Sequence, residues 1–225
     1  MKQAVIPLAL LLSLLAASCG VYSAQGTDIP LIDHRGMVNL NGNLSLAHVQ
    51  GNASVGITDH LALATSFSFA ERQKYYNQYM AGYYNPIGRG VLELYGGFGY
   101  GYGRQYYDHD PRMGVKGRYQ IYFAQVDYGW NNLANNHIDL GFALKTGLLH
   151  SNLHRIGTST HYHYPELAPA NHLLLEPSVQ FRVGGQHLKF SITLAYSFIS
   201  SSRMNNPAHF SDDPVTLLLG LIIKL

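Results

Sequence analysis

The sequence has little charge, one cysteine and no cluster of basic residues. Charged residues make up 12% of the 225 positions, and the formal net charge is +2. That fraction is about half of the ~25% usual in soluble domains. A nucleic-acid-binding protein usually has clustered Lys and Arg, and this sequence shows neither such clusters nor a large positive charge. A lone cysteine, Cys19, excludes a disulfide framework, a Cys-rich zinc site and an iron–sulfur cluster. The chain is instead rich in tyrosine (17) and glycine (23), which indicates a β protein that meets a medium less polar than water.

The N-terminal stretch has the layout of a secretion signal. Lys2 precedes an apolar run over residues 4–15, and small residues lead directly to Cys19. The run is too short to span a membrane as a helix, but it fits the apolar part of a signal peptide. The stretch resembles a bacterial lipoprotein signal, which implies a signal peptide over 1–18 and lipid on Cys19. An ordinary signal cleaved after Ser23, which would discard Cys19, stays open. We expect residues 19–35 to form an extended lead segment and residues 36–225 to form the folded domain.

From Gly36 onward the apolar residues alternate with small or polar ones, and no segment shows a convincing amphipathic helix. An example is Ile138, Leu140, Phe142, Leu144 and Leu148. Alternation with period two is typical of β-strands, whose side chains point to opposite faces in turn. The pattern predicts about ten strands, with eight as the alternative, near 37–48, 52–58, 60–70, 77–85, 90–104, 118–131, 137–150, 172–184, 187–199 and 214–225.

The connections and the two faces of these strands favour a membrane barrel. Short connections alternate with longer ones at 71–77, 106–117, 151–171 and 200–214, as in outer-membrane barrels. The polar face consists mainly of Gly, Ser, Thr, Ala and Asn, whereas a soluble barrel would carry Lys and Glu there. We therefore predict a single antiparallel up-and-down transmembrane β-barrel with a narrow, filled interior. Its charged residues are expected to face inward as a network: Glu93, Asp127, Asp139, Lys145, Glu176, Arg182 and Lys189, with Lys224 near the end of the chain.

Tyrosines gather near the ends of the predicted strands. Such a placement is typical of an aromatic girdle at a membrane interface, although tyrosine also favours strands in general. The predicted girdle consists of Tyr75, Tyr76, Tyr83, Tyr84, Tyr100, Tyr102, Tyr106, Tyr107 and Trp130.

Several short motifs resemble those of small Bacteroidetes-type outer-membrane β-barrel proteins, many of which carry a lipoprotein signal. They are Cys19, Ile29-Pro30-Leu31, Gly36, the segment Tyr122-Phe123-Ala124-Gln125 and the segment Leu175-Glu176-Pro177. The resemblance implies the fold and the outer membrane. It implies no activity, so Cys19 alone is carried over as a functional position. The chain departs from the usual pattern at its last residue, Leu225, where outer-membrane barrels commonly end in Phe.

Two groups of residues are candidates for chemistry. His161 and His163 lie on one side of an extended segment and form a candidate metal pair, which competes with the interpretation of a polar, His-rich loop. His209 and Ser211 would share one face of a strand, as a base and a nucleophile require, but Pro207 and Pro214 enclose them in a loop-like stretch.

These observations predict a non-enzymatic outer-membrane barrel with a structural or surface-interaction role and no open general pore. We expect no cofactor, both termini in the periplasm, and membrane lipid and the barrel-assembly machinery as partners. Two alternatives remain at this point. One is a soluble periplasmic or secreted calycin-like barrel whose Leu, Ile and Phe faces line a ligand cavity. The other is an outer-membrane hydrolase.

Overall fold

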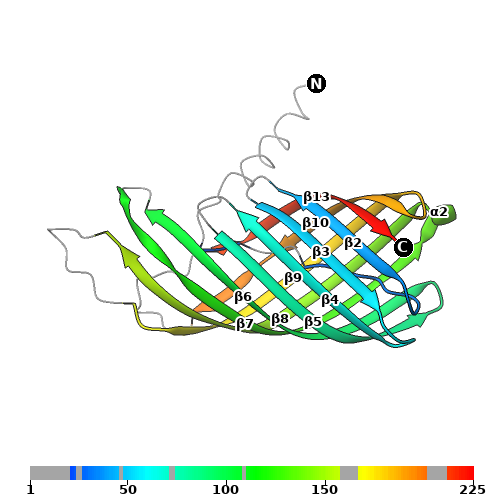
Figure 1. Cartoon of the computed structure of the whole chain (residues 1–225), viewed down its shortest axis with the longest axis horizontal. Helices are drawn as coiled ribbons and strands as arrows, with labels where there is room; N and C mark the ends of the chain where they lie inside the picture. The colour runs from blue at the N-terminus through cyan, green and yellow to red at the C-terminus, as the bar shows by residue number, and fades with distance from the viewer. Residues whose placement is uncertain are drawn as a thin grey trace, which may run out of the picture.

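The chain forms a closed antiparallel barrel of ten strands (Figure 1). The structure, a computed structural model, describes residues 21–23, 27–45, 48–70, 74–107, 110–157, 167–201 and 212–225. Its strands are β2 (Val38–Leu44), β3 (His48–Gly56), β4 (Leu61–Ala70), β5 (Lys74–Ile87), β6 (Gly90–Tyr107), β7 (Asp110–Asn132), β8 (Ile138–Ile156), β9 (Ala170–Gly184), β10 (Leu188–Tyr196), β11 (Phe198–Ser201) and β13 (Val215–Lys224).

Closure comes from β13, which pairs with β10 on one side and with β2 on the other. β10 and β11 both pair with β9 and are interrupted at Ser197, so they act as one strand of the barrel. The predicted fold class is therefore confirmed. Outside the barrel sheet, β1 (Tyr22–Ser23) pairs in parallel with β12 (Asp212–Asp213), and the short helix α2 (Leu133–Asn136) joins β7 to β8. No helix in the described ranges has the length and apolar character to cross a membrane.

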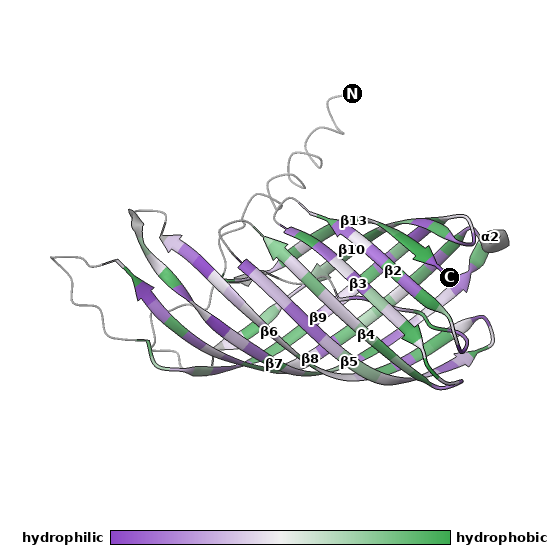
Figure 2. Ribbon diagram, viewed as in Figure 1, coloured by the Kyte–Doolittle hydropathy of each residue, from purple (hydrophilic) through white to green (hydrophobic). Residues whose placement is uncertain are grey.

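Exposed apolar side chains cover the outside of the barrel. Burial alternates strictly along β10, where Phe190 is 64% exposed and its neighbour Ser191 is 2% exposed. The same holds around the wall, and Figure 2 shows the alternation of hydropathy along the strands. An outward apolar face is what hydrocarbon requires. The calycin-like alternative needed these side chains to line a cavity, so it is wrong. The outward set includes Leu40, Phe67, Phe98, Leu144, Phe181, Ile192 and Leu221.

The two ends of the barrel differ. Short connections at 57–60, 88–89, 133–137 and 185–187 lie at the short-turn end, on the right of Figure 1 with α2 and the C-terminus. At the opposite, long-strand end, β6, β7 and β8 project beyond the other strands (Figure 1), with 18, 23 and 19 residues respectively. The predicted loop over 106–117 is therefore mostly strand, because β6 and β7 stay paired as far as Tyr107 and Asp110.

Two further predicted boundaries need correction. β8 extends to Ile156, so residues 151–156, predicted as the start of a loop over 151–171, belong to a strand. The first hairpin turns between Leu44 and His48, earlier than predicted. Gly51 lies within β3, and the ring of its cross-strand partner Phe67 covers it so closely that a Cβ there would clash. A glycine in mid-strand commonly marks such a close approach.

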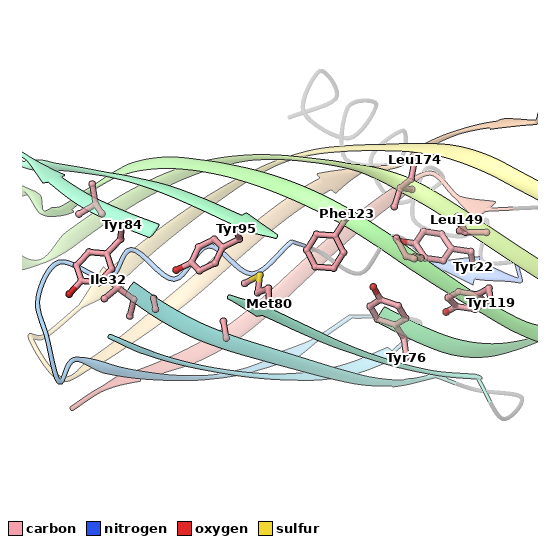
Figure 3. Close-up of a cluster of buried hydrophobic side chains, with 14 of the residues drawn as sticks. Tyr22, Ile32, Tyr76, Met80, Tyr84, Tyr95, Tyr119, Phe123, Leu149 and Leu174 are labelled. Carbon is pink, nitrogen blue, oxygen red and sulfur yellow. The ribbon is translucent and has the colours of Figure 1, made fainter. Parts of the chain in front are cut away.

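A segment that precedes the first strand of the barrel wall lies inside the barrel. Residues 27–34, which we call the lumen segment, enter the interior and reach the short-turn end, where the Gly36 amide donates to the Gly56 carbonyl at 2.8 Å. Ile29, Leu31 and Ile32 have no exposed surface. Figure 3 shows Ile32 beside Tyr84 at one end of a row of buried side chains and Tyr22 at the other. The interior is therefore filled both by side chains of the wall and by the lumen segment.

Candidate functional site

Glu93 of β6 binds the backbone of the lumen segment. Its carboxylate accepts hydrogen bonds from the Leu31 amide at 2.9 Å and the Ile32 amide at 2.8 Å. The Tyr95 hydroxyl donates to the same carboxylate at 3.0 Å. Glu93 has no exposed surface, and hydrogen bonds to a charged acceptor in such a place are among the stronger ones in proteins. Two consecutive amides on one carboxylate fix both the position and the direction of the segment.

Four side-chain donors from three other strands bind the carbonyl groups of the same segment. Gln125 donates to Asp28 O at 2.8 Å, and Asn131 donates to Leu31 O at 2.8 Å. Asn39 donates to Pro30 O at 2.6 Å, and the Arg182 guanidinium donates to Ile29 O. Four consecutive carbonyls, from residue 28 to residue 31, therefore have partners on β7, β9 and β2. Since buried backbone groups are costly when unpaired, this set of donors makes the interior a built site for an extended chain.

Glycines in the wall leave room for the segment. A Cβ at Gly141 would lie 2.9 Å from Ile29 Cγ2 and 3.5 Å from Leu31 Cδ1. A Cβ at Gly56 would lie 2.9 Å from Ile32 Cγ2 and 2.6 Å from the His34 carbonyl. Side chains at these positions would occupy the space that the segment fills, so the glycines are matched to its presence.

Asp139 is the centre of a buried ion cluster at the short-turn end. It meets Lys189 at 2.5 Å and Lys224 at 2.7 Å, and Arg182 Nη1 lies 3.9 Å from it. The amide of Asn132 also donates to Asp139, at 2.8 Å. Three cations converge on one carboxylate, and Arg182 extends from this cluster to the lumen segment.

A second ion pair lies further along the lumen. Lys145 of β8 and Glu176 of β9 are direct cross-strand neighbours, 3.1 Å apart and buried. Lys145 also donates to Gln78 at 2.9 Å and lies 4.7 Å from the centre of the Phe123 ring. The Tyr22 hydroxyl donates to Glu176 at 2.8 Å, which joins the start of the described chain to this pair.

The remaining two predicted charges, Glu93 and Asp127, are direct neighbours on β6 and β7. Glu93 is satisfied by the donors described above, and Gln125 donates to both oxygens of Asp127, at 3.0 and 2.8 Å. The structure thus places all seven sequence-predicted charged residues in the lumen and assigns them to three groups. Asp139, Arg182 and Lys189 form the first group, Lys145 and Glu176 the second, and Glu93 and Asp127 the third.

The predicted aromatic girdle is correct for only some of its members. Tyr75, Tyr83 and Tyr100 are exposed on the outside, whereas Tyr76 and Tyr84 point into the lumen and are buried. Adjacent strand residues face opposite sides, so Tyr75 and Tyr76 cannot both belong to an outer girdle. Inside, Tyr76 and Tyr119 stack at 5.9 Å, and Tyr22 meets Tyr119 edge-on at 5.5 Å.

The lumen segment itself was not identified from the sequence as part of the interior. The run over residues 29–32 has no strand periodicity, and its partners other than Asn39 lie about 60 to 150 residues away. Wall glycines in strands, such as Gly129 and Gly141, were the available signal. A Cβ at Gly129 would lie 2.8 Å from Leu31 Cδ2.

The other candidates for chemistry gain no support. Cys19, His161, His163, His209 and Ser211 lie outside the described residues. Within the described ranges, no group of three His, Cys, Asp or Glu residues is placed to hold a metal ion. A buried hydroxyl–imidazole contact joins Ser151 to His172 at 3.1 Å, and Ser151 also lies 3.3 Å from the Ala170 carbonyl. These contacts give the Ser151 hydroxyl and His172 Nε2 buried hydrogen-bond partners.

Comparison with known proteins gives likeness of shape alone. No protein-family model and no curated protein matches the chain. Among solved structures, the outer-membrane protease OmpT from Escherichia coli is similar with a TM-score of 0.47 and 9% identity, over 84% of this chain and 91% of that one. The KdgM porin, solved with disordered oligogalacturonate, has a TM-score of 0.41 and 11% identity, over 84% of this chain and 99% of that one. One of these two proteins is named a protease and the other a porin.

Proposed function

We propose that this protein is a closed outer-membrane β-barrel with a structural or surface-interaction role, without enzymatic activity and without an open pore. The observation that carries the proposal is the lumen segment, whose amides and carbonyls are bound by the wall and whose apolar side chains are fully buried. An interior built around a segment of its own chain leaves no room for a general diffusion path.

The burial of the charged side chains that line the lumen supports a closed interior. A water-filled channel leaves the side chains that line it in contact with water. Glu93, Asp127, Asp139, Lys145 and Lys189 have no exposed surface, although all five point into the lumen. These residues come from β6, β7, β8 and β10, so the block extends across the interior. The apolar outer face supplies the reason for insertion into a bilayer.

Closure is tested by conductance. Protein folded into planar bilayers is expected to give no steady single-channel current. The comparison variant replaces residues 27–34 by a Gly/Ser sequence of equal length, which removes the buried Ile and Leu side chains and weakens the block. It is expected to conduct if it folds. A variant with one substitution, Glu93→Gln, keeps the test valid if the first does not fold, because it is expected to conduct intermittently. Steady porin-like current from the unaltered chain would refute the proposal.

Location and lipid attachment are parts of the same proposal. An outer-membrane barrel would be delivered by the assembly machinery, with the short turns and both termini on the periplasmic side. Cys19 would carry lipid. Palmitate labelling and membrane fractionation of the Cys19→Ala variant test these two statements separately. Loss of label with unchanged fractionation is expected, because the barrel itself spans the bilayer. Unchanged labelling would show that Cys19 is not the lipid site.

A further inference from the structure

A group of cations lies on the outside of the barrel at the long-strand end. Arg104 of β6, Lys116 of β7 and Arg118 of β7 occupy outward positions of their strands, and the two residues of β7 are exposed. We call these three residues the cationic rim. Arg104 and Lys116 lie where β6 and β7 continue past the paired ends of β4 and β5, and Arg118 shares a row with those two strands. Figure 2 shows hydrophilic colouring on the projecting ends of β6 and β7.

The pairing register brings like charges together. Arg104 is directly opposite Lys116, and Arg118 is two positions further along β7, opposite Tyr102. Cross-strand neighbours have their Cβ atoms about 4.5–5.5 Å apart, and like charges in that position are destabilising. Among the outward residues of β6, β7 and β8 whose side chains the structure describes, none is a carboxylate. The wall thus maintains an unfavourable charge arrangement that a bound anion would relieve.

Directly below the rim lies a groove with an aromatic lining. It has a volume of about 400 Å³ and is lined by Phe69, Ala70, Lys74, Tyr75, Tyr102 and Arg118. Phe69 is opposite Tyr75, Tyr75 is opposite Tyr102, and Tyr102 is opposite Arg118, so the groove follows one row across four strands. The Tyr75 and Tyr102 rings stack at 6.0 Å. Arg118 lies at one end of this row and joins the groove to the rim.

The height of the rim matches the headgroup layer of a bilayer. The exposed apolar side chains around the outside of the barrel form an apolar belt. Tyr122, which is 64% exposed, belongs to this belt and lies four residues from Arg118 along β7. At a rise of about 3.3 Å per residue and a tilt of about 40°, the separation along the membrane normal is about 10 Å. A cation at that distance from the hydrocarbon region meets lipid headgroups, and its stem can lie along the apolar surface.

We propose that the cationic rim and the adjoining groove bind the phosphate-bearing headgroup of a membrane lipid in the leaflet at the long-strand end. The inference rests on the proposed membrane insertion. The belt supplies the acyl contacts, the groove supplies a flat aromatic surface, and Arg104, Lys116 and Arg118 supply the charge that phosphate requires.

The experiment compares lipid retention by protein folded into phosphatidylcholine nanodiscs that contain a minor fraction of diphosphorylated lipid A or of the same lipid with its phosphates removed. Native mass spectrometry then counts the lipid molecules that stay bound. We expect the unaltered protein to retain the phosphorylated lipid preferentially. Arg118→Gln and the double variant Arg104→Gln/Lys116→Gln are expected to reduce retention about fivefold for each cation removed. Arg89→Gln, an exposed cation at the short-turn end, is the matched control and is expected to change nothing.

Four results would overturn the proposal. They are equal retention of the two lipids, no loss in the rim variants, an equal loss in Arg89→Gln, and release of the lipid by millimolar inorganic phosphate, which would identify a site for free anions. The outcomes separate this inference from the proposed function. Protein that inserts but shows no headgroup preference refutes only the lipid site, whereas protein that fails to enter the nanodiscs refutes membrane insertion and the lipid site together.

Discussion

The two halves of the lumen are filled in different ways. Near the short turns, directional hydrogen bonds from Glu93, Gln125, Asn131 and Arg182 bind the backbone of the lumen segment. Toward the long-strand end, the rings of Tyr22, Tyr76 and Tyr119 fill the space around a single ion pair. Directional bonds specify one position of the backbone, whereas aromatic packing mainly fills volume. Substitutions in the first half should therefore be the more damaging ones.

The largest effect is expected at Asp139. Asp139→Ala leaves Lys189 and Lys224 buried without their carboxylate, which destabilises a protein by about 3–5 kcal/mol. We expect a lower urea midpoint and loss of heat-modifiable migration in detergent gels. The control is Asp59→Ala, at an exposed position in a short turn. A variant at Asp139 that unfolds at the urea concentration of the unaltered protein would show that the cluster contributes little.

The next effect concerns the lumen segment alone. Glu93→Gln keeps the shape of the side chain but removes the charge that accepts the Leu31 and Ile32 amides. Hydrogen bonds to charged groups contribute about 1.5–3 kcal/mol, so the exchange of these two amides with solvent should accelerate about tenfold or more. Hydrogen-exchange NMR measures this directly. Glu176→Gln, in the other half of the lumen, should leave both rates unchanged, and an equal acceleration there would remove the distinction between the halves.

A smaller effect tests the fit between wall and segment. Gly141→Ala places a methyl group 2.9 Å from Ile29 Cγ2 and is expected to cost about 1–3 kcal/mol. Combined with Ile29→Ala, the loss of stability should be smaller than the sum of the two single losses, because the two residues touch. Gly96→Ala, where a Cβ meets nothing within 4 Å, is the matched control. Strictly additive effects of the pair in urea unfolding would mean that the segment does not press on the wall.

The smallest effect is expected at the aromatic end. Tyr22→Phe keeps the ring among its neighbours and removes one hydrogen bond to Glu176, which retains Lys145. The expected loss is about 1 kcal/mol. Tyr79→Phe, on the exposed outer face, provides the baseline. If Tyr22→Phe destabilised as much as Asp139→Ala, the aromatic half would be as specific as the polar half.

The barrel itself could be predicted from the sequence because its signal is local. Alternation along a strand such as β10 appears within ten residues, and the identity of the polar face separates a membrane barrel from a soluble one. The prediction of the aromatic girdle was wrong where it placed two adjacent strand residues, such as Tyr75 and Tyr76, on the same face of the wall. Errors also arose at β6 and β7, where glycine-rich and charged residues resemble a loop but remain paired.

The filling of the interior could be predicted only in part. An inward location for Asp139 and Lys145 follows from strand parity and from the cost of placing charge in hydrocarbon. The partners that they choose depend on register around the closed sheet, which the sequence alone does not give. The contact of Leu31 and Ile32 with Glu93 joins residues about 60 positions apart and leaves no periodic trace.

The position of the lumen segment also constrains the order of assembly. The barrel closes at the seam between β13 and β2, and β2 is continuous with the segment through Gly36. After the seam has formed, the segment could reach its place only by being drawn lengthwise through an interior whose charged lining is already paired. The geometry therefore predicts that the wall curls around the segment before β13 and β2 pair, so that the seam closes over a filled interior.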